Sequence, residues 1–338
     1  MNSIPLVSII IPCYNSEKFI YKTLETVANQ TYKNIEVIIV DDGSKDNTVD
    51  ISKNILENKK VRYKIICQSN SGVSVARNNG IKNSNGEFIF FLDSDDFIDE
   101  LCIETVVKKL VKDDLDIIWF GYNYIDEYGN YTMKYEENYN YSIVESGKDA
   151  LIKQLNHNIS ICNINIVYKR DIILKNNIKF YEKCYYGEDQ EFILKSIFHA
   201  NKVGCIDKVM AYYFQRSNSA THNFNLKRFT GLGAAKRIEK YIKNLTNDKI
   251  IINLLNNKIA LEILQIYHNY VKCEKVSKQY YEHIFSKLKI KYKKELINYK
   301  ISSKKDIKYK FLSNIFLINP NLYKQLLLYK QGKNNVRK

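Results

Sequence analysis

Short apolar runs alternate with amphipathic stretches through the first third of the chain. Runs dense enough for strands buried on both faces occupy residues 6–11, 35–40, 61–67 and 87–92. Between them, apolar residues recur at helical spacing over residues 19–28, 47–57 and 71–82. Strands and helices that alternate in this way predict parallel strands joined by right-handed crossovers. We therefore expect an α/β protein with a doubly wound, mostly parallel sheet and helices on both faces.

The pattern loosens further along the chain. A helix over residues 99–113 and a strand over 115–122 are predicted, and residues 123–145 fit either an irregular insertion or a pair of edge strands. A strand is expected over residues 209–214. After residue 224, Lys, Tyr, Ile and Asn dominate, and the pattern predicts an α-helical C-terminal region.

The fourth apolar run ends in three carboxylates within four positions, Asp93, Asp95 and Asp96. In open α/β sheets, ligands bind outside the carboxyl ends of the strands. Asp93 and Asp95 are therefore candidates for holding Mg²⁺ or Mn²⁺, which prefer carboxylate oxygens and phosphates. The alternative is that these residues cap a helix that starts near Asp99, because Asp and Ser are good caps.

The second apolar run ends in the same way, at Asp41 and Asp42. A carboxylate at this edge can accept hydrogen bonds from a nucleobase imide or a ribose hydroxyl. The alternative is turn chemistry, which Asp-Gly favours on backbone grounds and which suits Asp42-Gly43. For Asp41 we favour a role in binding.

The residues after the first strand exclude two common nucleotide sites. Pro12, Cys13, Tyr14 and Asn15 stand where a dinucleotide-binding protein has glycines, and the chain contains no Walker loop. A metal ion and Arg77 would then have to balance phosphate charge.

Four segments in order resemble family 2 of the glycosyltransferases: Val7–Asn15 (VSIIIPCYN), Val40–Ser44 (VDDGS), Ala76–Gly80 (ARNNG) and Leu92–Asp96 (LDSDD). The resemblance implies a GT-A fold and an inverting enzyme of surface polysaccharide biosynthesis. Its donor would be a nucleotide sugar, such as a UDP-linked hexose or N-acetylhexosamine, and its acceptor a glycan or a lipid-linked oligosaccharide.

The resemblance also assigns residues. The nucleotide-binding residues would be Pro12, Tyr14, Asn15, Asp41, Arg77 and Asp93. Asp93-Ser94-Asp95 matches the Asp-x-Asp motif, whose later Asp usually touches the metal. Many relatives carry Trp-Asn-Lys where this chain has Cys162-Asn163-Ile164, and this difference concerns acceptor and sugar preference.

Two later positions complete the implied site. Glu188-Asp189 matches an acidic pair whose Asp takes a proton from the acceptor hydroxyl, so Asp189 is the expected general base with Glu188 beside it. Stabilisation of a helix start by negative charge is the alternative. His222 stands where many GT-A enzymes carry a histidine that completes the metal site. We therefore expect Mn²⁺ or Mg²⁺ held by Asp95, Asp93 and His222.

The implied domains are a GT-A catalytic domain over residues 1–224 and a basic helical region over 225–338. The catalytic domain would divide into a nucleotide-sugar half, 1–121, and an acceptor half, 122–224. The formal charge of +15 lies in the last region, where residues 225–338 hold 26 Lys and Arg against 7 Asp and Glu, a net charge of +19. Such asymmetry suggests contact with a polyanion.

Within the basic region two apolar strips are flanked by lysines. One comprises Tyr309, Leu312, Ile315 and Phe316, and the other Leu322, Tyr323, Leu326, Leu327 and Tyr329. We predict that these strips lie on an anionic membrane surface. The alternative is that they pack onto the catalytic domain or form a homodimer through the C-terminal helices.

The cysteines favour a reducing compartment, because the seven are odd in number and contain no Cys-x-x-Cys pair. No basic leader or run long enough to span a membrane is evident. We expect a cytoplasmic protein, peripheral on the inner face of the cell membrane.

Three other functions are weaker. A sugar-1-phosphate nucleotidyltransferase would need a glycine-rich loop after the first strand. A processive synthase would need Gln-x-x-Arg-Trp, and the only tryptophan is Trp119. A non-catalytic module that binds nucleotides or a polyanion such as nucleic acid would not need acidic residues at both the nucleotide edge and the position of the general base. We expect no nucleic acid partner.

Overall fold

A computed structural model describes residues 4–135, 144–215, 225–272, 278–301 and 304–335 of the chain. The chain forms two compact units. The first contains residues 1–151, 160–183 and 188–219, and the second contains residues 152–159, 184–187 and 220–338. The boundary predicted between residues 224 and 225 adjoins the undescribed segment 216–224 and stays a prediction.

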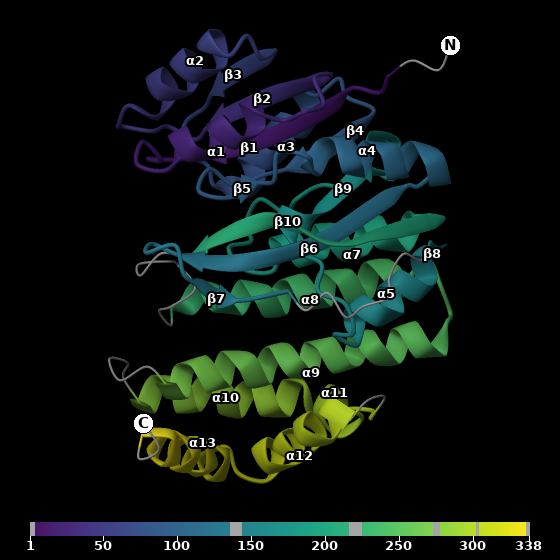
Figure 1. Ribbon diagram of the computed structural model, residues 1–338. Coiled ribbons are helices and arrows are strands. Elements are labelled where there is room, and N and C mark those ends of the chain that lie inside the picture. Colours follow the sequence, from purple (N-terminus) through teal and green to yellow (C-terminus); the bar gives the residue numbers. More distant parts are fainter. Residues whose placement is uncertain (1–3, 136–143, 216–224, 273–277, 302–303, 336–338) are drawn as a thin grey trace. The chain divides into compact units, whose positions relative to one another are not determined.

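The first unit is built on a mixed sheet with the strand order β3-β2-β1-β4-β9-β6-β10-β5, with β7 paired to β6 and β8 to β10 (Figure 1). Its strands are β1 (Val7–Cys13), β2 (Ile35–Asp41), β3 (Tyr63–Cys67), β4 (Phe88–Phe91), β5 (Phe97–Ile98), β6 (Ile117–Asp126), β7 (Tyr131–Met133), β8 (Glu145–Ser146), β9 (Ile166–Lys169) and β10 (Lys202–Gln215). Strands β3, β2, β1 and β4 are parallel, as the sequence predicts. Strand β9 is antiparallel to both β4 and β6, so β6 runs in the same direction as β4.

The helices of the first unit follow the predicted alternation. They are α1 (Ile20–Ala28), α2 (Thr48–Asn58), α3 (Val73–Asn83), α4 (Cys102–Asp113), α5 (Gly147–Leu155), α6 (Arg170–Lys175) and α7 (Glu188–His199), with a 3₁₀ turn η1 (Asn163–Asn165); α5 runs on into the second unit. Every residue of β1, β2 and β4 is buried, which confirms strands covered on both faces. A Cβ atom added to Gly80 would lie 2.3 Å from Ile10 Cγ2, so glycine lets α3 approach β1 closely.

Several boundaries differ from the predicted ones. The helix expected from Asp99 begins at Cys102, because Phe97–Ile98 forms β5 and pairs with β10. Strand β10 begins at Lys202, seven residues before the predicted start at Val209. Strand β6 continues to Asp126 and pairs there with both β10 and β7, so β7 is an edge strand within the 123–145 segment. Residues 136–143 lie outside the described part of the chain.

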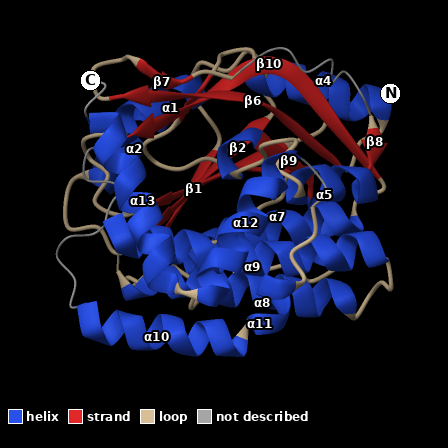
Figure 2. Ribbon diagram, turned by 90° about the horizontal axis from the view of Figure 1, so that it is seen from below, coloured by secondary structure: helices blue, strands red, loops and turns tan. Residues whose placement is uncertain are grey.

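The second unit is helical, as predicted (helices are blue in Figure 2). Its helices are α8 (Phe229–Lys243), α9 (Lys249–Lys272), α10 (Lys278–Lys291), α11 (Lys293–Ile297), α12 (Lys304–Ile318) and α13 (Pro320–Asn335). Tyr267 lies at the centre of its core, with ring centroids 4.6 Å from Phe285, 5.0 Å from Phe316 and 5.4 Å from Tyr323. No helix in the described residues is both long enough and apolar enough to span a bilayer.

The predicted membrane strips are wrong for most of their members. Ile315, Phe316 and Tyr323 are buried in the core of the second unit, and Tyr309, Leu312 and Leu327 pack against that core. Apolar residues are spread around helix α12 among its lysines, so spacing in the sequence did not distinguish its buried face from its exposed face. Leu322 and Leu326 remain exposed.

Candidate active site

The carboxyl ends of three parallel strands bring the predicted acidic residues to one edge of the sheet. Cys13 at the end of β1 is in register with Asp41 at the end of β2. Ile10 of β1 is in register with Phe91, where β4 ends two residues before Asp93. The arrangement predicted from the apolar runs is therefore present.

Asp93 and Asp95 lie in the loop between β4 and β5, where both are partly exposed. Their neighbour Asp96 is buried, and its Oδ1 accepts a hydrogen bond from the Phe214 backbone N–H at 2.9 Å. Ser94 Oγ lies 2.7 Å from Ser16 Oγ. Asp96 and Ser94 thus fix the loop. Because β5 separates this loop from α4, the acidic residues do not cap that helix.

Asp41 has a buried carboxylate oxygen without a partner in the part of the chain that the structure describes. The side chain is 4% exposed, and its Oδ2 accepts a hydrogen bond from the Ser44 backbone N–H at 3.1 Å. Its Oδ1 has no hydrogen-bond partner among the described residues. A buried acceptor without a partner costs free energy, so a ligand that supplied a donor here would gain affinity. A base imide or a ribose hydroxyl is such a donor.

Asp42 has a structural role, because both of its carboxylate oxygens are bonded to a loop that is distant in the sequence. Its Oδ1 accepts hydrogen bonds from Gln68 Nε2 at 2.8 Å and from the Ser71 N–H at 2.7 Å. Its Oδ2 accepts a third from the Gly72 N–H at 2.8 Å. Asp42 therefore holds the loop that leads into α3.

The end of β1 and the segment that follows it lie at the same edge. Pro12 is buried, whereas Tyr14 is exposed. Asn15 has a left-handed backbone with φ of 49°, and its Oδ1 accepts a hydrogen bond from the Lys45 N–H at 2.8 Å. Asn15 thus ties the β1 loop to the β2 loop and positions the residues around Asp41. Direct contact of Pro12, Tyr14 and Asn15 with a nucleotide stays a prediction.

Negative charge concentrates where these loops meet. Burial raises the pKa of the Cys13 thiol, and the charges of Asp41, Asp93, Asp95 and Asp46 raise it further. Burial likewise raises the pKa of Tyr213, with additional effects from Asp96, Asp93 and Asp95. Such a cluster favours a cation.

The donor set fits Mg²⁺ or Mn²⁺. Asp93 and Asp95 offer hard carboxylate oxygens on a partly exposed loop, which suits an ion that completes its shell with phosphate oxygens. Over the described ranges, no three His, Cys, Asp or Glu side chains gather as a preformed metal cage. His222, the third predicted ligand, lies outside the described residues.

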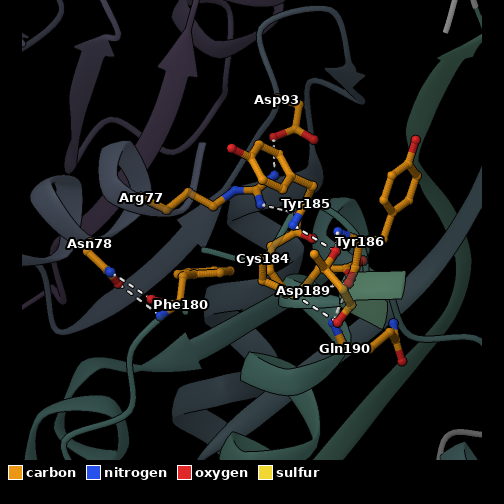
Figure 3. Close-up of polar contacts among 11 residues, drawn as sticks. Arg77, Asn78, Asp93, Phe180, Cys184, Tyr185, Tyr186, Asp189 and Gln190 are labelled. Carbon is orange, nitrogen blue, oxygen red and sulfur yellow. Dashed lines mark hydrogen bonds and ion pairs between the residues drawn. The ribbon is translucent and has the colours of Figure 1, made fainter. Parts of the chain in front are cut away.

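Arg77 links two parts of the site. It projects from α3, is 4% exposed, and donates from Nη2 to Asp93 Oδ1 at 2.7 Å (Figure 3). Its Nη1 lies 3.4 Å from Glu188 Oε1. The guanidinium also lies over the Phe180 ring, 5.3 Å from its centroid. Arg77 therefore joins the loop of Asp93 to the first turn of α7.

Glu188 and Asp189 form an acidic pair at the start of α7, where Glu188 is mostly buried and the two carboxylates repel each other. Burial and the adjacent Asp189 raise the pKa of Glu188 to about 7, although Arg77 lowers it. Asp189 Oδ1 accepts a hydrogen bond from the Gln190 N–H at 2.7 Å, so this residue also stabilises the helix start. Gln190 Nε2 in turn donates to the Ile161 carbonyl at 3.0 Å.

Two further residues of this site, Asn163 and Tyr168, were not predicted from the sequence. With its amide oxygen turned toward Arg77, Asn163 accepts hydrogen bonds from Nε at 3.2 Å and Nη2 at 3.3 Å. The sequence feature that could have indicated Asn163 is its position in Cys162-Asn163-Ile164, where many family members carry Trp-Asn-Lys. Tyr168 is fully buried with a hydroxyl that has no partner in the described part of the chain. Its pKa is raised by burial and by the charge of Asp189, which places it near the acidic pair.

Asn78 fixes the residue beneath Arg77. Its Nδ2 donates to the Phe180 carbonyl at 2.9 Å, and its Oδ1 accepts from the Phe180 N–H at 2.9 Å (Figure 3). This pair of bonds holds the segment before α7 against α3. The Ala-Arg-Asn motif thus supplies a cation and the amide that positions the ring under it.

Arg77→Met is expected to change the pH dependence of stability. The folded protein raises the pKa of Glu188 from an ordinary 4.5 to about 7, so it holds a proton that the unfolded chain has lost. Stability therefore falls as pH rises across this window. Without Arg77 that pKa rises further, and the fall extends to higher pH.

Urea unfolding at about pH 6 and about pH 8 measures this effect through the free energy of unfolding. The Arg77→Met variant should lose more of this free energy between the two pH values than the wild type. Arg77→Lys is the matched control, because it keeps the charge and should recover part of the difference. Equal pH dependence in the Met variant and the wild type would exclude the coupling of Arg77 to Glu188.

Several known proteins are similar to this chain. Residues 8–175 match the family model for glycosyl transferase family 2. The uncharacterized glycosyltransferase EpsJ of Bacillus subtilis is 30% identical over 220 residues, which cover 64% of this chain and 63% of EpsJ. TarP of Staphylococcus aureus, a poly(ribitol-phosphate) beta-N-acetylglucosaminyltransferase, is 28% identical over 67% of both chains.

A solved structure supports the fold. The chain resembles S. aureus TarS 1–349 in complex with UDP-GlcNAc, with a TM-score of 0.72 and 20% identity over 97% of this chain and 92% of that one. The fold is GT-A, with a helical C-terminal region. Through residues 8–175 the chain belongs to family 2 of the glycosyltransferases.

Proposed function

We propose that this chain is an inverting glycosyltransferase that moves a sugar from a UDP-linked donor to a hydroxyl of a glycan or a lipid-linked oligosaccharide. The observation that carries the proposal is the unpartnered Oδ1 of Asp41 at the edge that also presents Asp93 and Asp95. A nucleotide needs a hydrogen-bond acceptor for its base or ribose and a bound cation for its diphosphate. This edge presents Asp41 for the first, and Asp93 and Asp95 for the second.

The choice of a UDP-linked hexose or N-acetylhexosamine is supported by the names of two relatives. TarS was solved with UDP-GlcNAc, and TarP is named as a beta-N-acetylglucosaminyltransferase. The name of TarP gives poly(ribitol-phosphate) as its acceptor, which supports a polymer as the acceptor class here. A lipid-linked acceptor would place the reaction at the inner face of the cell membrane.

The reaction would be a single displacement. The acceptor oxygen forms a bond to the anomeric carbon while the bond from that carbon to the diphosphate breaks, and the nucleoside diphosphate leaves with the bonding electrons. Asp189 takes the proton of the acceptor hydroxyl as the bond forms. Attack opposite to the leaving group inverts the configuration, and no covalent enzyme intermediate is needed.

The remaining residues position the reactants. Asp41 orients the nucleoside, and Arg77 keeps the loop of Asp93 next to the start of α7. Glu188 is shielded from water and shares the cation of Arg77, so it tunes the charge beside Asp189. A divalent cation held by Asp93 and Asp95, with His222 as the predicted third ligand, would supply positive charge for the leaving diphosphate.

A thermal-shift titration with UDP and a panel of UDP sugars, with and without Mn²⁺, tests the nucleotide site. A bound ligand raises the apparent melting temperature by mass action, so UDP should stabilise the wild type. Asp41→Ala should weaken UDP binding by about tenfold, the order expected when a buried polar contact is lost. Asp50→Ala, on the surface helix α2, should bind UDP like the wild type. Unchanged UDP affinity in Asp41→Ala would show that Asp41 only stabilises the turn after β2 and does not bind the nucleotide.

A further inference from the structure

Helix α12 exposes an apolar face that differs from the one expected. Phe311 is 60% exposed and Ile318 75%, and Ile307 is also exposed. These residues are four and seven positions apart, so they share one side of the helix. Ser313 and Phe316 point the other way and are fully buried. One face of α12 thus packs into the second unit, and the other presents large apolar side chains to solvent.

Two lysines tie α12 to neighbouring helices. Lys310 Nζ donates to the Ile297 carbonyl at the end of α11, and Ile297 is exposed. Lys289 Nζ donates to the Ile318 carbonyl at 3.2 Å, and its neighbour Ile290 is exposed. We call Ile307, Phe311 and Ile318 the α12 surface.

The charge around the α12 surface is strongly positive. Lys308 on α12, Lys291 after Ile290 and Lys300 after α11 are all exposed. They belong to the region 225–338, with its net charge of +19. A second copy of this chain seated on the surface would bring two such regions together, and their repulsion opposes that contact. Nucleic acid would match the charge but would leave Phe311 and Ile318 in water.

We propose that the α12 surface docks on an anionic lipid bilayer. Aliphatic and aromatic side chains enter the boundary between headgroups and acyl chains, while flanking lysines meet the lipid phosphates. An apolar face surrounded by basic groups fits a lipid bilayer. A polyanion in water, such as nucleic acid, would contact the basic groups but would not bury the apolar face. The inference extends the proposed function by giving the enzyme a place beside a lipid-linked acceptor. It depends on no residue of the active site.

Vesicle sedimentation tests the proposal with the full-length protein and no sugar nucleotide, so its failure would leave the proposed function intact. The vesicles are phosphatidylcholine alone or phosphatidylcholine mixed with phosphatidylglycerol. The wild type should bind only the mixed vesicles and should be released by high salt, because exposed charges are screened. The double variant Phe311→Ser/Ile318→Ser should bind roughly tenfold more weakly, since two inserted side chains are lost.

Ile250→Ser is the matched control, because Ile250 is 57% exposed on α9 of the same unit beside Lys249. It should bind mixed vesicles like the wild type. Circular dichroism should show unchanged unfolding in both variants, since the mutated side chains are exposed. A wild type that ignores mixed vesicles at low salt would overturn the proposal. So would a double variant that binds like the wild type, or one that instead converts a dimer to a monomer in sedimentation velocity.

Discussion

Asp189→Asn is expected to lower the rate of sugar transfer by about a hundredfold or more while leaving donor binding intact. Asparagine keeps the shape of the side chain and can still accept a hydrogen bond from the Gln190 N–H, so α7 should still begin at the same place. It cannot take a proton from the acceptor hydroxyl, and general-base catalysis typically contributes this much to a rate.

The measurement compares initial rates of UDP release and UDP affinity in Asp189→Asn and the wild type. Asp171→Asn is the matched control, because Asp171 is exposed on α6 and paired with Lys175 at 2.8 Å. It should transfer at the rate of the wild type. A transfer rate in Asp189→Asn near that of the wild type would place the base at another residue, and Glu188 would be the next to test.

Asp95→Asn should abolish the Mn²⁺-dependent part of UDP binding without unfolding the protein. Asparagine removes a hard anionic ligand from the partly exposed loop, and the loop itself is fixed by Asp96 and Ser94. The change in melting temperature that UDP produces should therefore be the same with and without Mn²⁺ in this variant. In the wild type, Mn²⁺ should increase it.

The same titration in Asp171→Asn controls for loss of one surface carboxylate. Chelation of the metal from the wild type should reproduce the Asp95→Asn result, because both remove the cation from the same place. Retention of a Mn²⁺-dependent shift in Asp95→Asn would assign the metal to other ligands. His222, which lies outside the described residues, would then become the leading candidate for mutation.

Local patterns in the sequence were sufficient for the first half of the sheet. The apolar runs that became β1, β2 and β4 are buried on both faces, and such runs have few alternatives in a folded chain. Because parallel strands end at one edge, the positions of Asp41 and Asp93 followed from the same runs. The roles of neighbouring polar residues could not be predicted in this way. Asp42 accepts hydrogen bonds from three protein donors, whereas one oxygen of Asp41 has no partner among the described residues, and only the structure shows this difference.

Long-range contacts determine the features that local sequence patterns do not predict. The insertion of β9 between β4 and β6 depends on strand pairing across many residues, and no local signal encodes it. Arg77 was predicted to lie near the nucleotide, but its bonds to Asp93 and Glu188 join residues that are 16 and 111 positions away. On α12 apolar residues occur on both faces, so only packing shows that Phe316 is buried and Phe311 exposed.

Proton NMR of donor cleavage tests the central claim most directly. The purified chain is incubated with Mn²⁺ and a panel of α-linked UDP sugars, and the anomeric proton of the released or transferred sugar is followed from the start of the reaction. Direct displacement assisted by Asp189 predicts that the β-anomer appears first and that Asp189→Asn forms it far more slowly. First appearance of the α-anomer, or UDP binding without cleavage of any donor in the presence or absence of acceptor glycans, would contradict the account.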